Sequence, residues 1–530
     1  MIALAIAITI LVYLYFCATR NFDYWSKRGV THDKPIPIFG NYARVLFSKI
    51  SVTNITAELY RKYANEKIVG FFKGTQPQLV IRDPEIVKHV LMTDFYHFSS
   101  RGIFHEHKGI EPLFRNLFFA DGDTWRLLRQ RMTPAFTSGK LRAMFPLIVE
   151  RAEKLQTRVL SAAAIDRVID SRDLMARYTT DFIGACGFGL DSDSLSDENS
   201  PFRQLGSKIF KTSFKKHVKG ILKEICPFFF KHLKFMADIE NDMLELIEGI
   251  QRLRNYEPSE RNDFIDLMLE CKKQGIIVGE SIEKFNKDGK PEIVELELTE
   301  ILIAAQVFIF FAAGFETSSS ATSFTLHQLA YNPEVQKKVQ EEIDRVLLKY
   351  ENKLSYDAIK EMTYLNWTLK EGMRMFPSLG VFFRECVRPY TFKQLNVPID
   401  KGVLVMIPIQ ALHNDPQFFV NPEVFRPERF SPEEFHQIQK DVYMPFGTGP
   451  RACIGKLFLL SKQVNNLPFI FFIVLRIQIP TNSIRFIRYI VKLIFIVKLT
   501  AVCYLLFVFF GRLLQIILMS CSISFNVFNY

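Results

Sequence analysis

Polar and apolar residues repeat mainly with helical spacing along this chain. From about residue 112 to 275, apolar residues recur three and four positions apart in nearly every window, and a long helix is predicted from near Thr299 to Gln328. Residues 68–82 instead indicate two short strands around a glycine-containing turn, and residues 391–410 alternate toward strand. The pattern predicts a mostly α protein with a small β portion.

The first residues form an apolar run, Met1–Ala18, that only Thr9 interrupts. A helix over this run would be about 27 Å long, close to the thickness of a bilayer core. Arg20 and Lys27 follow the run and no charged residue precedes it, which predicts that the rest of the chain faces the cytoplasm. We therefore expect a membrane anchor over residues 1–19. A cleaved secretory signal is the alternative, but such signals normally begin with charge.

Composition narrows the class of protein. The chain has 530 residues, 48% of them hydrophobic, so it can bury a large core. Its net charge is +11, but no dense basic stripe with interleaved aromatic residues appears in the main body, and no nucleic-acid partner is expected. The eight cysteines form neither a C-x-x-C pair nor a disulfide framework, which favours a reducing compartment.

The segment PFGTGPRACIG, residues 445–455, carries the most informative chemistry. A cysteine that binds iron must be a thiolate, and a turn that directs backbone N–H groups at the sulfur stabilises that charge. The glycines at 447, 449 and 455 would let the backbone curve close to a flat cofactor. Taken alone, a cysteine before a hydrophobic helix is more often a buried structural thiol.

This segment resembles the haem-binding loop of the cytochromes P450, F-x-x-G-x-R-x-C-x-G, and matches all five fixed positions. The resemblance implies haem b as cofactor, with Cys453 as the iron ligand. It also implies that Phe446 packs beside the ligand and that Arg451 pairs with a haem propionate. The fold implied is that of the cytochromes P450, mostly α with a small β portion, here preceded by an N-terminal membrane anchor helix.

A glutamate and an arginine one helical turn apart, Glu371 and Arg374, can meet on one helix face. Alone, such a pair is usually a solvated surface feature. Because the segment NPEVFRPERF (421–430) follows, the two resemble the salt-bridge triad of the family, with Arg429 as the third member. The role implied is structural.

The sequence AGFETS follows an apolar run, residues 301–311, whose only polar member is Gln306. Buried polar groups there must be hydrogen-bonded or functional, and a helix kink with internally satisfied groups is the alternative to a catalytic role. The segment resembles the oxygen-activation motif of the family. That resemblance implies that Gly314 makes room for dioxygen and that Thr317 with Glu316 relays protons.

Two further segments are candidates for contact with the haem propionates. Trp125 and Arg129 resemble the W-x-x-x-R of the third main helix of the family, and a surface Trp–Arg stack is the alternative. Arg384 fits another propionate contact, or else is an ordinary charge beside a strand.

A lipophilic substrate pocket is expected, although aromatic residues at helical spacing are more often core than pocket. Its candidate residues are Phe104, Phe118, Phe119, Phe308, Phe311, Leu379 and Phe382.

The resemblance implies an NADPH-dependent monooxygenase that inserts one atom of dioxygen into lipophilic small molecules. These are xenobiotics such as plant toxins or insecticides, or endogenous hormones. No G-x-G-x-x-G follows a predicted strand, so the electrons are expected from a separate NADPH-cytochrome P450 reductase, with cytochrome b5 as a second candidate donor. Arg126, Lys456 and Lys462 are candidate contacts for an acidic reductase.

The pairing of AAGFETSSS with PFGTGPRACIG is similar to insect microsomal enzymes of the detoxification type (clan 3-like). This predicts a location in the endoplasmic reticulum membrane, with the catalytic domain facing the cytoplasm. A haem-thiolate isomerase or dehydratase remains open as an alternative, but the intact Glu316–Thr317 pair argues against it.

The chain departs from the family pattern after residue 463. Residues 464–530 contain no acidic residue and are dominated by Ile, Phe, Leu and Val. One hypothesis is a translated intron, because Gln463–Val464 can be encoded by an in-frame donor site. The others are a membrane-inserted tail and a catalytically silent membrane protein whose altered tail prevents haem incorporation. The predicted organisation is an anchor (1–19), a linker with a proline-containing hinge (20–40), a C-terminally truncated haem-thiolate monooxygenase domain (41–463) and an aberrant tail (464–530).

Overall fold

A computed structural model describes the chain between residues 2 and 456. Residue 1, residues 457–530 and a few internal residues (104–108, 165–169, 191–192, 198–199, 211–213, 226, 231 and 262) lie outside the description. The predicted tail therefore lies outside the described residues, and the domain limits stay a prediction.

The chain divides into two units, one containing α1 (Ile2–Thr19) and the other beginning at Asn21. Two of the described helices are long and apolar enough to cross a membrane, α1 and α13 (Glu300–Tyr331). Most residues of α1 are exposed, whereas more than half of the apolar window in α13 is buried inside the protein. Only α1 therefore keeps its apolar surface open to a membrane, as an anchor requires.

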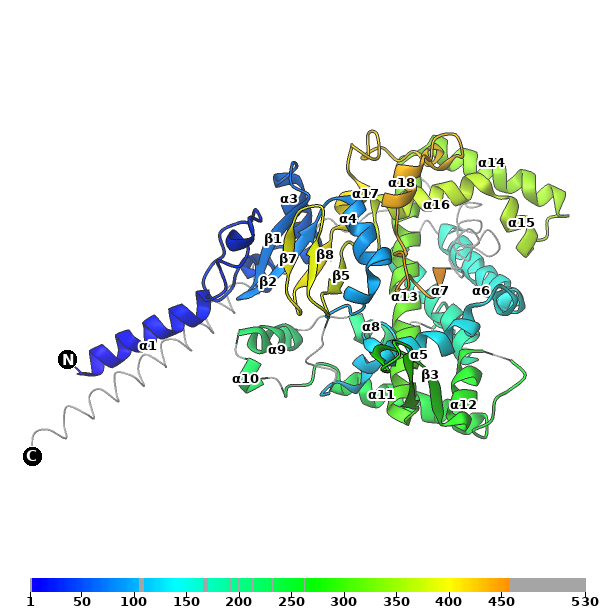
Figure 1. Cartoon of the computed structure of the whole chain (residues 1–530). Coiled ribbons are helices and arrows are strands. Elements are labelled where there is room, and N and C mark those ends of the chain that lie inside the picture. The colour runs from blue at the N-terminus through cyan, green and yellow to red at the C-terminus, as the bar shows by residue number, and fades with distance from the viewer. Residues whose placement is uncertain are drawn as a thin grey trace, which may run out of the picture. The chain divides into compact units, whose positions relative to one another are not determined.

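The second unit is mostly helical, as the hydrophobic spacing predicts (Figure 1). Thr299 begins α13, because its hydroxyl accepts the N–H of Leu302 as an N-cap. The other helices that position the site are α5 (Gly122–Met132), α7 (Ser171–Ile183), α8 (Pro201–Phe210), α11 (Ala237–Leu253), α12 (Phe264–Gln274), α14 (Pro333–Lys349), α16 (Thr363–Met375) and α17 (Ile409–His413).

The main sheet has four strands in the order β1-β2-β8-β5. These strands are β1 (Ile68–Lys73), β2 (Gln76–Ile81), β8 (Leu404–Ile407) and β5 (Phe382–Glu385). The two strands expected over residues 68–82 are confirmed, and they pair antiparallel. β8 then pairs parallel with β2 and antiparallel with β5, so segments more than three hundred residues apart share one sheet (Figure 1).

Two hairpins complete the β portion. β6 (Tyr390–Phe392) pairs with β7 (Val397–Ile399) inside the stretch expected to alternate toward strand. The second hairpin, β3 (Ile276–Phe285) with β4 (Pro291–Glu297), lies between α12 and α13 and was not anticipated from the sequence.

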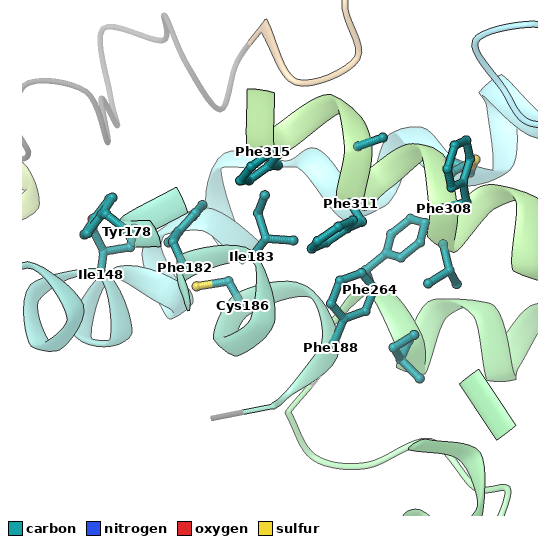
Figure 2. Close-up of a cluster of buried hydrophobic side chains, with 14 of the residues drawn as sticks. Ile148, Tyr178, Phe182, Ile183, Cys186, Phe188, Phe264, Phe308, Phe311 and Phe315 are labelled. Atoms are coloured by element: carbon teal, nitrogen blue, oxygen red, sulfur yellow. The ribbon is translucent and has the colours of Figure 1, made fainter. Parts of the chain in front are cut away.

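Aromatic side chains fill the core along α13 and α7, as Figure 2 shows. Phe311 lies 4.7 Å from Phe202 and 6.1 Å from Phe315, measured between ring centroids. Burying each such ring contributes about 1.5–3 kcal/mol, which makes α13 a rigid axis for the residues that project from it.

Candidate functional site

The loop before Cys453 curls tightly at two glycines. Gly447 and Gly449 have φ of +69° and +72°, in the left-handed region that favours glycine. A Cβ at Gly449 would overlap the carbonyl oxygen of Leu91, so no other residue fits there. The N–H of Cys453 donates to the carbonyl of Phe446 over 2.8 Å and closes the loop.

A buried histidine holds the beginning of this loop. Nε2 of His413, which ends α17, accepts the N–H of Met444 over 3.0 Å. The side chain is fully buried, and burial lowers the pKa of His413 to about 3. The imidazole is therefore neutral and remains an acceptor at neutral pH.

Cys453 is accessible to solvent, although the surrounding protein atoms desolvate its thiol. Burial raises the pKa of the Cys453 thiol, while the N–H of Gly455 and the charges of Arg129, Arg101 and Lys456 act in the opposite direction. A thiolate is the form that binds iron. The hydrogen bond and the positive charges thus favour the thiolate.

Four arginines converge around the Cys453 loop: Arg101, Arg129, Arg384 and Arg451. Burial lowers the pKa of Arg101 to about 10 and that of Arg384 to about 9. Burial also holds the pKa of Arg451 well below its usual range, and the charge of Arg101 adds to the effect. Like charges are thus crowded together where solvent does not screen them.

Several donors of this cluster lack an acceptor. Within the described part of the chain, Nε of Arg384 and both Nη atoms of Arg451 make no hydrogen bond, although Nη2 of Arg451 lies 3.5 Å from the carboxylate of Asp121. Unsatisfied buried cations are costly, and a dianion with several oxygens would satisfy them. The residues present therefore fit the two propionates of haem.

Helix α5 supplies two further contacts. The ring of Trp125 lies 4.2 Å from the guanidinium carbon of Arg451, and Nη1 of Arg129 donates to the carbonyl of Ala452 over 2.9 Å. Trp125 is 3% exposed. These residues hold the loop at Arg451 and at Ala452, whereas their expected propionate contacts stay a prediction.

The AGFETS segment lies in α13, where Ala313 is exposed although most of its neighbours along the helix are buried. On the side where a Cβ would project, Gly314 faces α7, because that Cβ would lie 2.8 Å from Cδ1 of Ile183. The role of Gly314 in making room for dioxygen stays a prediction. Gly314 allows α7 and α13 to approach closely. Ala313 is the small residue on the solvent-accessible side of α13, which we call the open side.

Glu316 and Thr317 have separate partners. The carboxylate of Glu316 accepts from Arg172 on α7 over 2.8 Å. The hydroxyl of Thr317 donates to the carbonyl of Ala313 over 2.6 Å. No hydrogen bond between the Glu316 and Thr317 side chains occurs among the described residues. Their joint role in a proton relay stays a prediction.

The expected triad is assembled in the core. Nε of Arg374 lies 2.7 Å from Glu371, and Nε of Arg429 lies 3.1 Å from the same carboxylate. Glu371 and Arg374 are fully buried and Arg429 is 4% exposed. Arg374 also donates to the carbonyls of His413 and Pro422, so the triad joins α16, α17 and the segment that precedes the Cys453 loop.

The pocket candidates fall into different surroundings. Phe118 and Phe119 are half-buried, with ring centroids 4.9 Å apart, and Phe382 on β5 lies beside Gly447. Leu379 is 44% exposed.

The remaining candidates are less accessible. Phe308 and Phe311 are buried in the aromatic core of Figure 2, and Phe104 lies outside the described residues. The pocket as a whole stays a prediction.

Sequence patterns missed the residues that hold Phe118 and Phe119. Oδ1 of the fully buried Asn116 accepts the N–H of both phenylalanines, at 3.0 and 3.2 Å. Oε1 of Gln306 on α13 accepts the N–H of Leu117 over 2.8 Å. The isolated Gln306 in its apolar run was the available signal.

Arg101 was also missed, because it belongs to no recognised motif. Its Nη1 donates to the carbonyl of Phe118 over 2.7 Å and its Nη2 to that of Arg451 over 3.2 Å. The side chain therefore links the Phe118 loop to the Cys453 loop.

A mostly helical fold with a buried arginine cluster beside the accessible Cys453 fits a haem-thiolate type of protein. The family model for cytochrome P450 matches residues 31–459 of this chain. The chain belongs to the cytochrome P450 family, and membership implies a monooxygenase that uses haem and dioxygen.

The chain is similar to several insect members. It is 36% identical over 454 residues to cytochrome P450 6B2 of Helicoverpa armigera, covering 86% of this chain and 88% of that protein. It is 37% identical over 477 residues to cytochrome P450 6a2 of Drosophila melanogaster, covering 86% and 90%. Cytochrome P450 6B1 of Papilio polyxenes is 34% identical over 464 residues, covering 86% and 89%.

Proposed function

We propose that this chain is an NADPH-dependent monooxygenase of lipophilic small molecules, anchored by α1 in the endoplasmic reticulum membrane with its catalytic domain in the cytoplasm. Electrons would come from a separate NADPH-cytochrome P450 reductase, with cytochrome b5 as a second donor. The observation that carries the proposal is the cluster of unsatisfied buried arginines beside Cys453. Insect relatives support detoxification as the broader role.

When bound, haem would supply the activation of dioxygen at an iron held by Cys453. Arg384 and Arg451 would bind the propionates, because their free N–H groups need anionic acceptors. Arg101 and Arg129 would add positive charge beside the sulfur and so lower the pKa of the Cys453 thiol, against the effect of burial, which raises it.

Protons would enter from the α7 side of α13. Arg172 is 66% exposed at its side chain and binds Glu316, so the carboxylate lies between solvent and the helix. The Thr317 hydroxyl would accept a proton from that side and donate one toward the open side beside Ala313, once it releases the Ala313 carbonyl.

A reduced carbon-monoxide difference spectrum of the full chain in microsomes tests this function. The thiolate-type Soret band is expected for the wild type, and a different position is expected for Cys453→His, because imidazole replaces thiolate. A wild-type chain without the thiolate band would favour the catalytically silent protein. Turnover without NADPH and reductase would favour the isomerase.

Sequencing of cDNA across codon 463 tests the origin of residues 464–530. A transcript spliced there would support the translated-intron hypothesis, and one that reads through to residue 530 would contradict it.

A further inference from the structure

The β3–β4 hairpin touches the helix that carries two of the site residues. β3 packs against α5, and Figure 1 shows the two elements beside each other. Gly279 of β3 makes this approach close, because a Cβ there would lie 2.7 Å from the side chain of Leu127 on α5.

The regular pairing of β3 with β4 is interrupted between Glu280 and Phe285. In this bulge the Ser281 hydroxyl accepts the N–H of Glu283 over 3.0 Å and that of Lys284 over 2.8 Å. Ser281 is 2% exposed. Its oxygen thus organises the bulge and leaves the hydroxyl proton for a partner outside the hairpin.

That partner is Asp123, in the first turn of α5. The Ser281 hydroxyl donates to the Asp123 carboxylate over 2.8 Å, and the N–H of Ile282 donates to it over 2.8 Å. Arg388 holds the same bulge from the other side through the carbonyl of Ile282. Because the carboxylate is charged, these are stronger contacts than neutral hydrogen bonds.

A second carboxylate from the hairpin lies at the start of α5. A Cβ at Gly122, whose φ is +52°, would overlap the Glu283 carboxylate, so that group lies against the first residue of the helix. Negative charge is favourable at this end of a helix. Asp121, in the N-cap position, makes no side-chain cap bond and lies 3.5 Å from Arg451 instead.

The hairpin therefore supplies negative charge at the helix start, where the Asp121 side chain makes no cap bond, and the Asp121 carboxylate lies beside Arg451. Beyond its first turn, α5 carries Trp125 against Arg451 and Arg129 against the Ala452 carbonyl. A shift of this helix would move Asp121, Trp125 and Arg129 together, and all three contact the Cys453 loop.

We propose that the β3–β4 hairpin is a clamp that retains haem, with Asp123 and Ser281 as positioning residues that act through α5 on Arg451 and the Cys453 loop. The proposal rests on the proposed function, because it requires that the chain binds haem.

Haem transfer from the full-length chain to excess apomyoglobin tests the clamp. Asp123→Asn and Ser281→Ala should release haem severalfold faster than the wild type, at or below the roughly tenfold effect of losing a direct partner of a metal ligand, because both residues act through α5. Ser281→Thr keeps the hydroxyl and should restore slow release. Asp288→Asn removes the same charge from the exposed turn of the hairpin rather than from α5, and should leave the rate unchanged.

Far-UV circular dichroism of each haem-loaded chain at the transfer temperature separates positioning from general stability. Faster haem release while the helical signal stays at the wild-type level supports the clamp. Release at the wild-type rate overturns it, and so does faster release that only accompanies an equal loss of the helical signal. A wild type that takes up no haem would overturn the proposed function as well, whereas a normal wild-type spectrum with unaffected variants would overturn the clamp alone.

Discussion

The residues around Cys453 combine charges that would be unfavourable without a ligand. Arg451 lies near the guanidinium groups of Arg101, Arg384 and Arg129, and Asp121 is the carboxylate beside it. Buried like charges of this kind are typical of binding sites, and a dianionic cofactor would offset the repulsion between the guanidinium groups. Motif spacing identified three of these arginines. Arg101 could only be found in space, because its partners are 17 and 350 residues away in sequence.

His413 gives the site a dependence on pH. Burial lowers the pKa of His413 to about 3, while an unfolded histidine titrates near about 6.5. The unfolded chain therefore binds the proton first, so this contribution to stability is present above pH ~6.5 and is lost as the pH falls toward 3. Between pH 7 and 5 the loss should be about 2 kcal/mol.

Denaturant unfolding of the wild type and of His413→Gln at both pH values measures this effect. Gln offers a neutral acceptor for the Met444 N–H and has no proton to gain, so its stability should fall less between pH 7 and 5. Equal slopes in the two proteins would contradict the assignment.

At the scale of elements, the buried triad joins α16 to the segment that leads to the Cys453 loop. Glu371→Gln would leave Arg374 and Arg429 without their shared charge partner, which should cost about 3–5 kcal/mol. Urea unfolding followed by tryptophan fluorescence measures the loss. Glu361→Gln is the matched control, because that glutamate pairs with Lys349 at the surface and its loss should change stability little.

The carboxamide of Gln306 links α13 to the turn that presents Phe118 and Phe119. Gln306→Leu keeps the size of the side chain but leaves the buried Leu117 N–H unpaired, at a cost of about 1–3 kcal/mol. The turn should then relax, and the ratio of products from a substrate with several oxidisable carbons should change. Chromatography of the products measures the ratio.

Gln328→Leu, near the other end of α13, is the control for that substitution and should keep the wild-type ratio. The carbon-monoxide spectrum should be unchanged in both variants, because neither residue contacts Cys453 among the described interactions. An unaltered product ratio in Gln306→Leu would exclude a role of this link in substrate orientation.

At the scale of the whole molecule, the proposed function requires that electrons reach Cys453 from a separate reductase. Arg126 on α5 and Lys456 are exposed near the Cys453 loop, whereas Lys462 lies outside the described residues. Arg126→Glu should slow reductase-supported turnover severalfold at low salt and weaken its salt dependence, because steering charge is reversed.

Turnover supported by hydrogen peroxide, which needs no reductase, should stay at the wild-type level in Arg126→Glu. Lys401→Glu, an exposed lysine in the turn between β7 and β8, is the matched charge reversal. Equal losses in the two variants would show a general charge effect rather than a docking site.

Local pattern sufficed for the apolar N-terminal helix, the long helix α13 and the Cys453 loop, because each depends on residues close together in the chain. The loop needs glycine where φ is positive, and this requirement is visible in the sequence itself. The β3–β4 hairpin was missed although residues 286–290 contain a turn-forming Asp-Gly, because a bulge breaks the alternation of β3.

The sequence by itself was enough to predict the family, the candidate iron ligand Cys453 and three of the four arginines around its loop. Only the tertiary structure decided that Ala313 of α13 is exposed among buried neighbours and that the Asp121 carboxylate lies beside Arg451 without capping its own helix. Only the tertiary structure, too, decided that a distant hairpin holds α5. These features depend on contacts between segments far apart in the chain. Short-range spacing cannot encode which side chain fills a space when its neighbour comes from another element.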